Sequence, residues 1–288
     1  MQTVTTLDVL RNSVDELRRD GGPIALVPTM GALHEGHLAL VREAKAKATH
    51  VIASIFVNPR QFGPKEDFGA YPRQLARDSE LLEAEGVALL WAPEPAEVYP
   101  EGYATNVSVA GVSEGLCGAD RPGHFDGVAT VVLKLFNQVR PDMAFFGEKD
   151  WQQLAVIRRM ARDLDLTQPR VDAIHGVAIV READGLAMSS RNAYLSPGQR
   201  AAAAALPAAM NDAISTLRSG APVSRALANL HDSLLVSGFD SVDYAELRDG
   251  DSLAPLEGII GNARLFVAAR VGGTRLIDNM AITDESNG

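Results

Sequence analysis

Short apolar runs that alternate with helix-patterned segments constrain the fold of this chain more than any other feature. Each run is too short for a typical helix and is nearly continuous, as expected of a strand buried on both faces. The runs are 24–27, 51–57, 87–91 and 143–146, and the segments with helical spacing are 7–17, 37–48, 75–85, 125–139 and 151–164. This alternation predicts βαβ units around a parallel sheet, which is an α/β fold.

The pattern changes after about Gly176. Ser196, Pro197 and Gln199 form a capping-box sequence that predicts the start of a long helix, and 223–236 predicts a second helix. Segments 241–247 and 264–280 look like strands, the latter folded back at Gly272-Gly273. A chain of 288 residues is long enough for two domains. We therefore expect an α/β domain at 1–176 and a smaller α+β domain at 177–288.

Charge and composition exclude several classes of protein. The net charge of -10 disfavours a general nucleic-acid binder, although a local basic pocket remains compatible with it. The single cysteine, Cys117, excludes an intrachain disulfide and is expected to be a small loop residue. The first 20 residues lack a signal-peptide pattern, and no apolar run is long enough to cross a membrane. These features predict a cytoplasmic protein without a nucleic-acid or membrane partner.

The segment PTMGALHEGH at 28–37 follows a predicted strand and opens a predicted helix. Such a junction offers exposed N–H groups and the positive end of the helix dipole to an anion. His34 and His37 share one face there and can donate hydrogen bonds to phosphate oxygens. The alternatives are a metal pair or a purely structural pair. The spacing is not that of zinc proteases, and no third ligand of obvious spacing follows.

Two further segments could contact phosphates. MSSRN at 188–192 places two hydroxyls beside the guanidinium of Arg191, which suits a triphosphate, but it could equally be a turn with a capping serine. GEKDWQQ at 147–153 follows a predicted strand. There Lys149 could meet a phosphate and Gln153 a bound acid, while Asp150 could simply cap the helix.

Neutral polar groups follow another strand. Asn58 and Gln61 suit the hydroxyls and carboxylate of a small polar substrate, although a plain polar loop is the alternative. Because the carboxyl ends of parallel strands meet at one edge, segments 28–37, 58–61 and 147–153 should converge. Arg121 and His124 could contact an anion or lie in a surface loop. Asp78 could hold Mg²⁺ or be a solvated helix residue.

Together these strings resemble a known family. The histidine pair and MSSR are similar to the HxGH and KMSKS-like signatures of the nucleotidyltransferase superfamily, which includes class I aminoacyl-tRNA synthetases. The segments at 28–37, 56–62, 121–127, 147–150 and 188–192 look specifically like the pantothenate synthetase (pantoate–β-alanine ligase) family, in order and over nearly the whole chain. One small departure is Arg60, where many members carry another residue, often methionine.

The resemblance implies a Rossmann-like parallel-sheet N-terminal domain, a smaller α+β C-terminal lid domain and a homodimer. It casts His37 as the key catalytic residue with His34 beside it, and it places pantoate against Gln61 and Gln153, with Met30 near its methyl groups and β-alanine also near Gln61. From the residues themselves we expect Lys149 and Arg191 to be catalytic, Asn58 to bind substrate and Asp78 to be the candidate Mg²⁺ ligand. The residues that the resemblance places against ATP are Met30, Gly31, Ala32, Leu33, His34, Glu35, Gly36, His37, Gly147, Glu148, Lys149, Asp150, Val180, Met188, Ser189, Ser190 and Arg191.

The implied reaction uses ATP to join pantoate to β-alanine through a pantoyl adenylate, releasing pyrophosphate and AMP. Three alternatives remain at this point. One is a nucleotidyltransferase that stops at nucleotide transfer. Another is a class I aminoacyl-tRNA synthetase, which the short, acidic chain disfavours because no basic tRNA-binding domain is visible. The third is a nucleotide-binding regulatory protein without turnover, against which the intact set of histidines, lysine and arginine argues.

Overall fold

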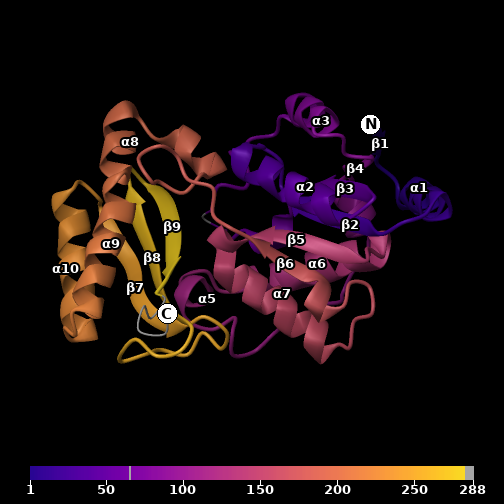
Figure 1. The fold of residues 1–288 in the computed structure, drawn as a ribbon. Helices are drawn as coiled ribbons and strands as arrows, with labels where there is room; N and C mark the ends of the chain where they lie inside the picture. Colours follow the sequence, from indigo (N-terminus) through magenta and orange to yellow (C-terminus); the bar gives the residue numbers. More distant parts are fainter. Residues whose placement is uncertain (65, 283–288) are drawn as a thin grey trace. The chain divides into compact units, whose positions relative to one another are not determined.

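The chain folds into two compact units (Figure 1). The computed structural model describes residues 1–64 and 66–282. The first unit contains Met1–Ser113, Arg121–Glu148 and Gln153–Ala178, and the second contains Glu114–Asp120, Lys149–Gln152 and the chain from Ile179 onward. Two short segments that precede residue 179 in the sequence thus fold with the C-terminal unit.

The first unit is built on a six-stranded sheet in which every pair of neighbouring strands is parallel. This confirms the predicted α/β class. The spatial order is β1-β4-β3-β2-β5-β6. The strands are β1 (Gln2–Val4), β2 (Ile24–Thr29), β3 (His50–Ile55), β4 (Leu89–Trp91), β5 (Met143–Gly147) and β6 (Ile174–Val177). The four central strands match the four apolar runs, and the two edge strands were not predicted.

Helices cover both faces of this sheet, with α2 and α3 above it and α6 and α7 below it in Figure 1. Side chains of β2 such as Ala25 and Val27 pack against Val41 and Ala44 of α2, which makes one face of the core. The helical elements of the unit are α1 (Leu7–Asp20), α2 (Glu35–Lys47), η1 (Pro59–Gln61), α3 (Leu75–Ala84), α4 (Pro95–Val98), α6 (His124–Val139), α7 (Trp151–Asp163) and η3 (Val171–Ala173), and η2 (Glu148–Asp150) begins in it.

The second unit is a three-stranded antiparallel sheet with helices packed on it. Central strand β8 (Ala263–Val271) is almost wholly buried between β7 (Ser241–Asp249) and β9 (Thr274–Ala281). The predicted turn is confirmed, because Gly272 and Gly273 adopt φ of 58° and 78° between β8 and β9. The helical elements are α5 (Leu116–Asp120), η4 (Ser190–Tyr194), α8 (Pro197–Ala203), α9 (Ala205–Arg218) and α10 (Val223–Val236).

The expected single long helix after Ser196 is two helices. The capping box is present, because the Ser196 hydroxyl accepts from the backbone of Gln199 and the Gln199 side chain accepts from the backbone of Ser196. The helix stops at Ala203, however, and α9 begins at Ala205. Pro207 explains the break: it has no N–H to donate four residues back, and its ring clashes with the carbonyl at that position, which belongs to Ala203.

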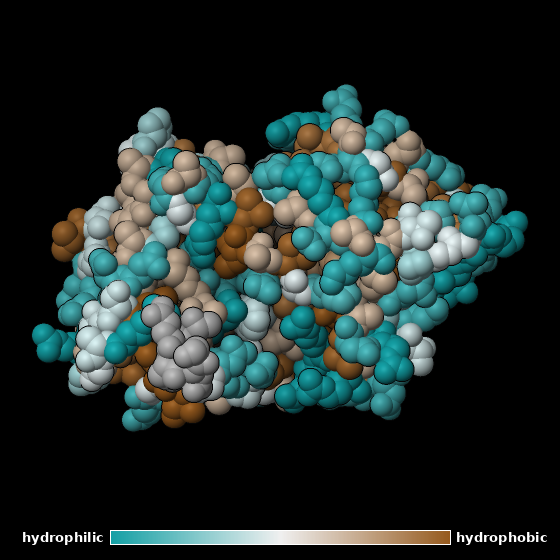
Figure 2. All heavy atoms as spheres, viewed as in Figure 1, coloured by the Kyte–Doolittle hydropathy of each residue, from teal (hydrophilic) through white to brown (hydrophobic). Residues whose placement is uncertain are grey.

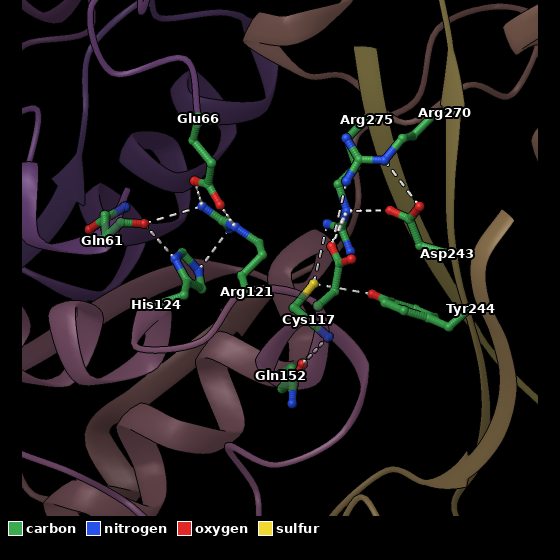
Figure 3. A network of polar contacts seen from close by, with 11 residues as sticks. Gln61, Glu66, Cys117, Arg121, His124, Gln152, Asp243, Tyr244, Arg270 and Arg275 are labelled. Carbon is green, nitrogen blue, oxygen red and sulfur yellow. Dashed lines mark hydrogen bonds and ion pairs between the residues drawn. The ribbon is translucent and has the colours of Figure 1, made fainter. Parts of the chain in front are cut away.

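The prediction that Cys117 is a small loop residue is wrong. Cys117 is a buried residue of α5. Its thiol lies 3.1 Å from the Tyr244 hydroxyl on β7 and accepts from Arg275 on β9 at 3.5 Å (Figure 3). Burial raises the pKa of the Tyr244 phenol. Asp120 pairs with Arg275 at 3.0 Å. The cysteine therefore belongs to a polar cluster that fastens α5 to the sheet of the second unit.

On the face shown in Figure 2, hydrophilic residues cover most of the surface and apolar residues form small separate groups. Among the described residues, none of the helices has the length and apolar character that a membrane span requires.

Candidate active site

The strand order of the first unit places a topological switch point between β2 and β5. From β2 the chain proceeds through β3 to β4 on one side, and it then returns to add β5 and β6 on the other side of β2. Ligands of open parallel sheets bind outside the carboxyl ends of the strands at such a point. The loop after β2 begins at Met30, and Glu148 follows β5. Two of the sequence-predicted segments thus leave the sheet at its natural binding edge.

His34 and His37 interlock at the start of α2. His34 is the N-cap, and its Nδ1 accepts from the N–H of Gly36 at 3.1 Å. His37 Nδ1 accepts from the N–H of His34 at 3.3 Å, and the ring centroids are 4.1 Å apart. Because each Nδ1 uses its lone pair in a cap, the proton of each neutral imidazole lies on Nε2. The pair therefore combines a capping box with two Nε2–H donors beside the positive end of a helix.

A buried carboxylate holds the loop that carries these histidines. Asp78 on α3 is 0% exposed, and its two oxygens accept from the N–H groups of Ala32 at 2.8 Å and Leu33 at 2.9 Å. Ala32 has a φ of 51°, which is unusual for a residue with a side chain, so these bonds offset local strain. Asp78 is thus an anchor for the loop, and because it is 0% exposed it leaves no open side for Mg²⁺ and its waters and does not fit the predicted role of a magnesium ligand.

Among the described residues, no group of three histidine, cysteine, aspartate or glutamate side chains is arranged to hold a metal ion. The reading of His34 and His37 as a metal pair gains no support from the structure.

Asn58 and Gln61 lie at η1, after the end of β3, and Gln61 contacts Met30 from the neighbouring loop. The Asn58 side chain donates to Gln61 Oε1 at 3.0 Å, and Gln61 Nε2 donates to Met30 Sδ at 3.0 Å. Asn58 is 1% exposed and Gln61 is 8% exposed. Three predicted substrate-binding residues from two segments are therefore brought into one hydrogen-bonded chain, which supports the expected convergence.

Arg121 and His124 both contact the backbone carbonyl of Gln61 (Figure 3). Arg121 donates to the Gln61 carbonyl at 3.2 Å, and His124 Nδ1 lies 2.8 Å from the same oxygen. Arg121 also pairs with Glu66 at 2.5 Å. Burial alone would raise the pKa of Glu66, but hydrogen bonding and charge from Arg121 hold that pKa below its usual range. Arg121 and His124 thus position Gln61.

In the second unit, residues 180–191 form a tight loop. Met188 donates its N–H to the carbonyl of Val180 at 3.0 Å, so these two predicted ATP-binding residues are neighbours. Ser189 caps η4, and its hydroxyl accepts from the N–H of Arg191 at 3.3 Å. Ser190 is the first residue of η4. The capping-serine reading is therefore correct for Ser189, and it leaves the phosphate-clamp reading open.

Ion pairs brace this loop. Arg200 pairs with Glu182 and with Asp184, both at 2.6 Å. Asn192 donates to Glu182 at 2.8 Å. A hydrogen bond from Arg200 lowers the pKa of Asp184, and this outweighs a smaller opposing effect of burial.

The remaining predicted residues occupy the ends of strands and helices. Gly147 closes β5, and Glu148, Lys149 and Asp150 form η2. Within the second unit, the carbonyl of Lys149 accepts from Asn279 at 3.0 Å. The half-buried Gln153 lies in the first turn of α7, and in the first turn of α2 exposed Glu35 pairs with Arg42 and precedes Gly36.

Comparison with known proteins decides the family. Residues 2–281 match the family model described as pantoate-beta-alanine ligase. The chain is 66% identical to pantothenate synthetase of Novosphingobium aromaticivorans, over 98% of this chain and 99% of the relative. The chain belongs to the pantoate–β-alanine ligase family. It is therefore an enzyme of the ligase class.

Other members of the pantoate–β-alanine ligase family agree over the full length. Pantothenate synthetase of Sphingopyxis alaskensis is 59% identical over 98% of this chain and 100% of the relative. The crystal structure of the Thermus thermophilus synthetase matches with a TM-score of 0.91 at 46% identity, covering 99% of this chain and 100% of that one. A Francisella tularensis pantoate-beta-alanine ligase, complexed with beta-gamma ATP and beta-alanine, matches with a TM-score of 0.82 at 31% identity, covering 99% of this chain and 100% of that one.

Sequence reasoning missed two residues of the site. The Tyr99 hydroxyl donates to Asn58 Oδ1 at 2.9 Å from 41 positions away. Glu66 pairs with Arg121 from 55 positions away. Neither residue lies in a predicted strand-end segment, so periodicity and spacing gave no signal for them.

Proposed function

We propose that this enzyme joins pantoate to β-alanine at the expense of ATP, through a pantoyl adenylate held at the carboxyl edge of the parallel sheet. The observation that carries the proposal is the pair of interlocked histidines at the topological switch point, in a chain that matches the pantoate–β-alanine ligase family over residues 2–281. A carboxylate is a poor acyl donor, and adenylation gives it a good leaving group.

The first step is adenylation. A pantoate carboxylate oxygen attacks the α-phosphorus of ATP, the new P–O bond forms, and the bond to pyrophosphate breaks. We assign His34 and His37 to donate Nε2–H hydrogen bonds to the phosphate oxygens as negative charge builds up, with Lys149, Ser189, Ser190 and Arg191 supplying further donors. Since the capping box holds both rings before substrate binds, these donors need little reorganisation.

The second step is amide formation. The β-alanine amine attacks the carbonyl carbon of the adenylate, the amine loses a proton, and AMP leaves with the bonding electrons of the C–O bond. No covalent bond to the enzyme forms, so Cys117 has no role. The mixed anhydride is labile in water, and shielding it is the role we propose for residues 177–288 as a lid over the domain at 1–176.

Pantoate is proposed to lie against Gln61, Gln153, Asn58 and Met30, and ATP against the backbone of 30–37 and 147–150 together with Val180 and Met188. Magnesium would enter as the counter-ion of the triphosphate and neutralise part of its charge. Asp78 does not fit as its protein ligand, since it is 0% exposed and is bonded to the backbone of the loop at 30–34. We further propose a cytoplasmic homodimer, which light scattering of the purified protein tests.

The test is AMP release from ATP and pantoate, with and without β-alanine, in the wild type, His37→Ala and His37→Gln. Glutamine at the third helical position retains the capping-box acceptor but lacks the imidazole. We expect turnover only with both substrates, and a loss of kcat of about 10²-fold or more in both variants.

Each other result has a distinct meaning. Sustained release of pyrophosphate from ATP and pantoate without β-alanine, and without release of AMP, would make the chain a nucleotidyltransferase that stops at nucleotide transfer. ATP binding without turnover would favour a regulatory protein. Full activity in His37→Gln would mean that His37 serves only as a helix cap.

A further inference from the structure

The side-chain amide of Asn58 has one possible orientation. Its Oδ1 accepts from the backbone N–H of Arg60 at 3.2 Å, and its Nδ2 donates to the backbone carbonyl of Gly127 at 3.1 Å. Backbone N–H groups only donate and carbonyls only accept, so exchanging the oxygen and nitrogen of this amide would break both bonds. The assignment therefore rests on the backbone and not on a choice among side-chain rotamers.

This orientation determines the direction of every neighbouring bond. Asn58 Nδ2 is a donor, so the Gln61 atom 3.0 Å from it must be the carbonyl oxygen. The Gln61 NH₂ group then faces Met30 Sδ at 3.0 Å. At the other end, Asn58 Oδ1 is an acceptor, so the Tyr99 hydroxyl 2.9 Å away must donate. The result is a one-way relay from Tyr99 through Asn58 to Gln61.

The last hydrogen bond of the relay is weak, because its acceptor is the sulfur of Met30. A thioether sulfur is a poor acceptor, and the Gln61 NH₂ group therefore keeps most of its capacity to bind a better one. An oxygen of a substrate hydroxyl or carboxylate is such an acceptor. A donor at the same place would meet the NH₂ group and be repelled.

Tyr99 is held firmly at the head of the relay. It is the C-cap of α4, and its ring lies against Phe56 and Tyr103 with centroid separations of 6.2 and 5.0 Å. Burial raises the pKa of its phenol, so the hydroxyl keeps its proton throughout the neutral range. The guanidinium of Arg60 lies 5.6 Å from its ring centroid.

We propose that Tyr99 is a positioning residue for the acid substrate: through Asn58 it fixes the Gln61 amide with its NH₂ group toward the substrate, so that Gln61 selects an acceptor oxygen. The inference rests on the proposed function, because that function makes pantoate the ligand of Gln61. It adds a residue that lies outside the sequence motifs of the site.

The experiment measures KM for pantoate and for ATP, and kcat, in Tyr99→Phe. The variant keeps the ring and removes one donor. We expect KM for pantoate to rise about two- to tenfold, as for the loss of one net hydrogen bond, while KM for ATP and kcat stay within about twofold. In a Gln61→Ala background the same change should alter KM for pantoate by less than about twofold, because the side-chain amide that Asn58 orients is then absent. Tyr103→Phe, which removes a hydroxyl from the adjacent ring, is the matched control and should match the wild type.

Three results would overturn the inference: an unchanged KM for pantoate in Tyr99→Phe, an equal rise in both KM values, or an effect of the same size in the Gln61→Ala background. Absence of turnover in the wild type would instead reject the proposed function. If a variant fails to fold, NMR of the wild-type enzyme still tests the inference. On adding pantoate, the side-chain NH₂ resonance of Gln61 should shift and that of Asn58 should stay, and a Gln61 resonance that does not move contradicts the relay.

Discussion

The two loops proposed to hold ATP are stabilised by different means. The loop at 30–34 in the first unit is held by Asp78, a carboxylate that is 0% exposed and accepts hydrogen bonds from the backbone N–H groups of Ala32 and Leu33. The loop at 180–191 in the second unit is braced by Arg200, whose side chain and those of its partners Glu182 and Asp184 are 27–38% exposed. Buried hydrogen-bonded charges resist salt and rearrangement, whereas exposed ion pairs are weak and screened.

This contrast indicates a division of labour. The first loop is held by buried hydrogen bonds to a carboxylate, and the second by ion pairs that salt and low pH can weaken. Three substitutions probe the contrast, and the expected effects decrease from the first to the last.

Asp78→Asn should have the largest effect. The asparagine amide keeps the shape but offers one acceptor for two N–H groups and turns a donor toward one of them. We expect the free energy of unfolding to fall by about 2–4 kcal/mol, and kcat/KM to fall with it. Urea unfolding and steady-state kinetics measure both. Glu80→Gln, an exposed neutralisation on the same helix, is the control. Wild-type stability combined with a shifted Mg²⁺ dependence would show instead that Asp78 is a metal ligand.

Gly127→Ala should have an intermediate effect, because it disturbs the substrate side of the first unit without touching Asp78. A Cβ at Gly127 would lie 2.2 Å from the carbonyl oxygen of Arg60 and 2.8 Å from Cα of Gln61. Pushing α6 from η1 should cost about 1–3 kcal/mol of stability and raise KM for pantoate more than KM for ATP. Gly198→Ala, where a Cβ would meet open space, is the matched glycine control. Equal stability of the two variants would refute the close packing.

Arg200→Gln should have the smallest effect, at most about 1 kcal/mol in unfolding free energy. The pKa of Asp184 is lowered in the folded state, so the pair contributes fully above the ordinary carboxyl range and the contribution is lost as pH falls through the lowered pKa. The difference between wild type and variant should therefore shrink progressively as pH falls below about 4, and it should also shrink in about 1 M salt. Thermal melts across pH and salt test this, and a difference that persists in high salt would place this loop in the same class as the first one.

The sequence was sufficient where local pattern decides structure. The apolar runs at 24–27 and 143–146 required buried parallel strands, and the polar segments after them were expected at one edge of the sheet. The edge strand β6 escaped notice because Ile174–Val177 contains a histidine and a glycine and has no apolar run. The break between α8 and α9 was missed because Pro207 lies three residues beyond it.

Polar contacts between residues far apart in the chain could not be predicted from the sequence. Asp78 was noticed as a lone helical carboxylate, but its partners lie 45 and 46 positions earlier, and nothing in the spacing indicates which backbone groups it meets. The same holds for Tyr99 and Asn58. Sequence therefore named most of the groups proposed to touch the ligands, while the groups that hold them in place emerged only from the fold.

The capping box of His34 and His37 also bears on how such an enzyme can change over evolutionary time. Each histidine is a helix cap as well as the proposed donor to phosphate. Most replacements at either position therefore weaken the start of α2 in the same event that removes the imidazole. A lineage that loses activity by such a replacement also begins with a less stable protein. Only the few residues that can still accept the capping hydrogen bond, such as glutamine at 37, would give an inactive protein that keeps its stability.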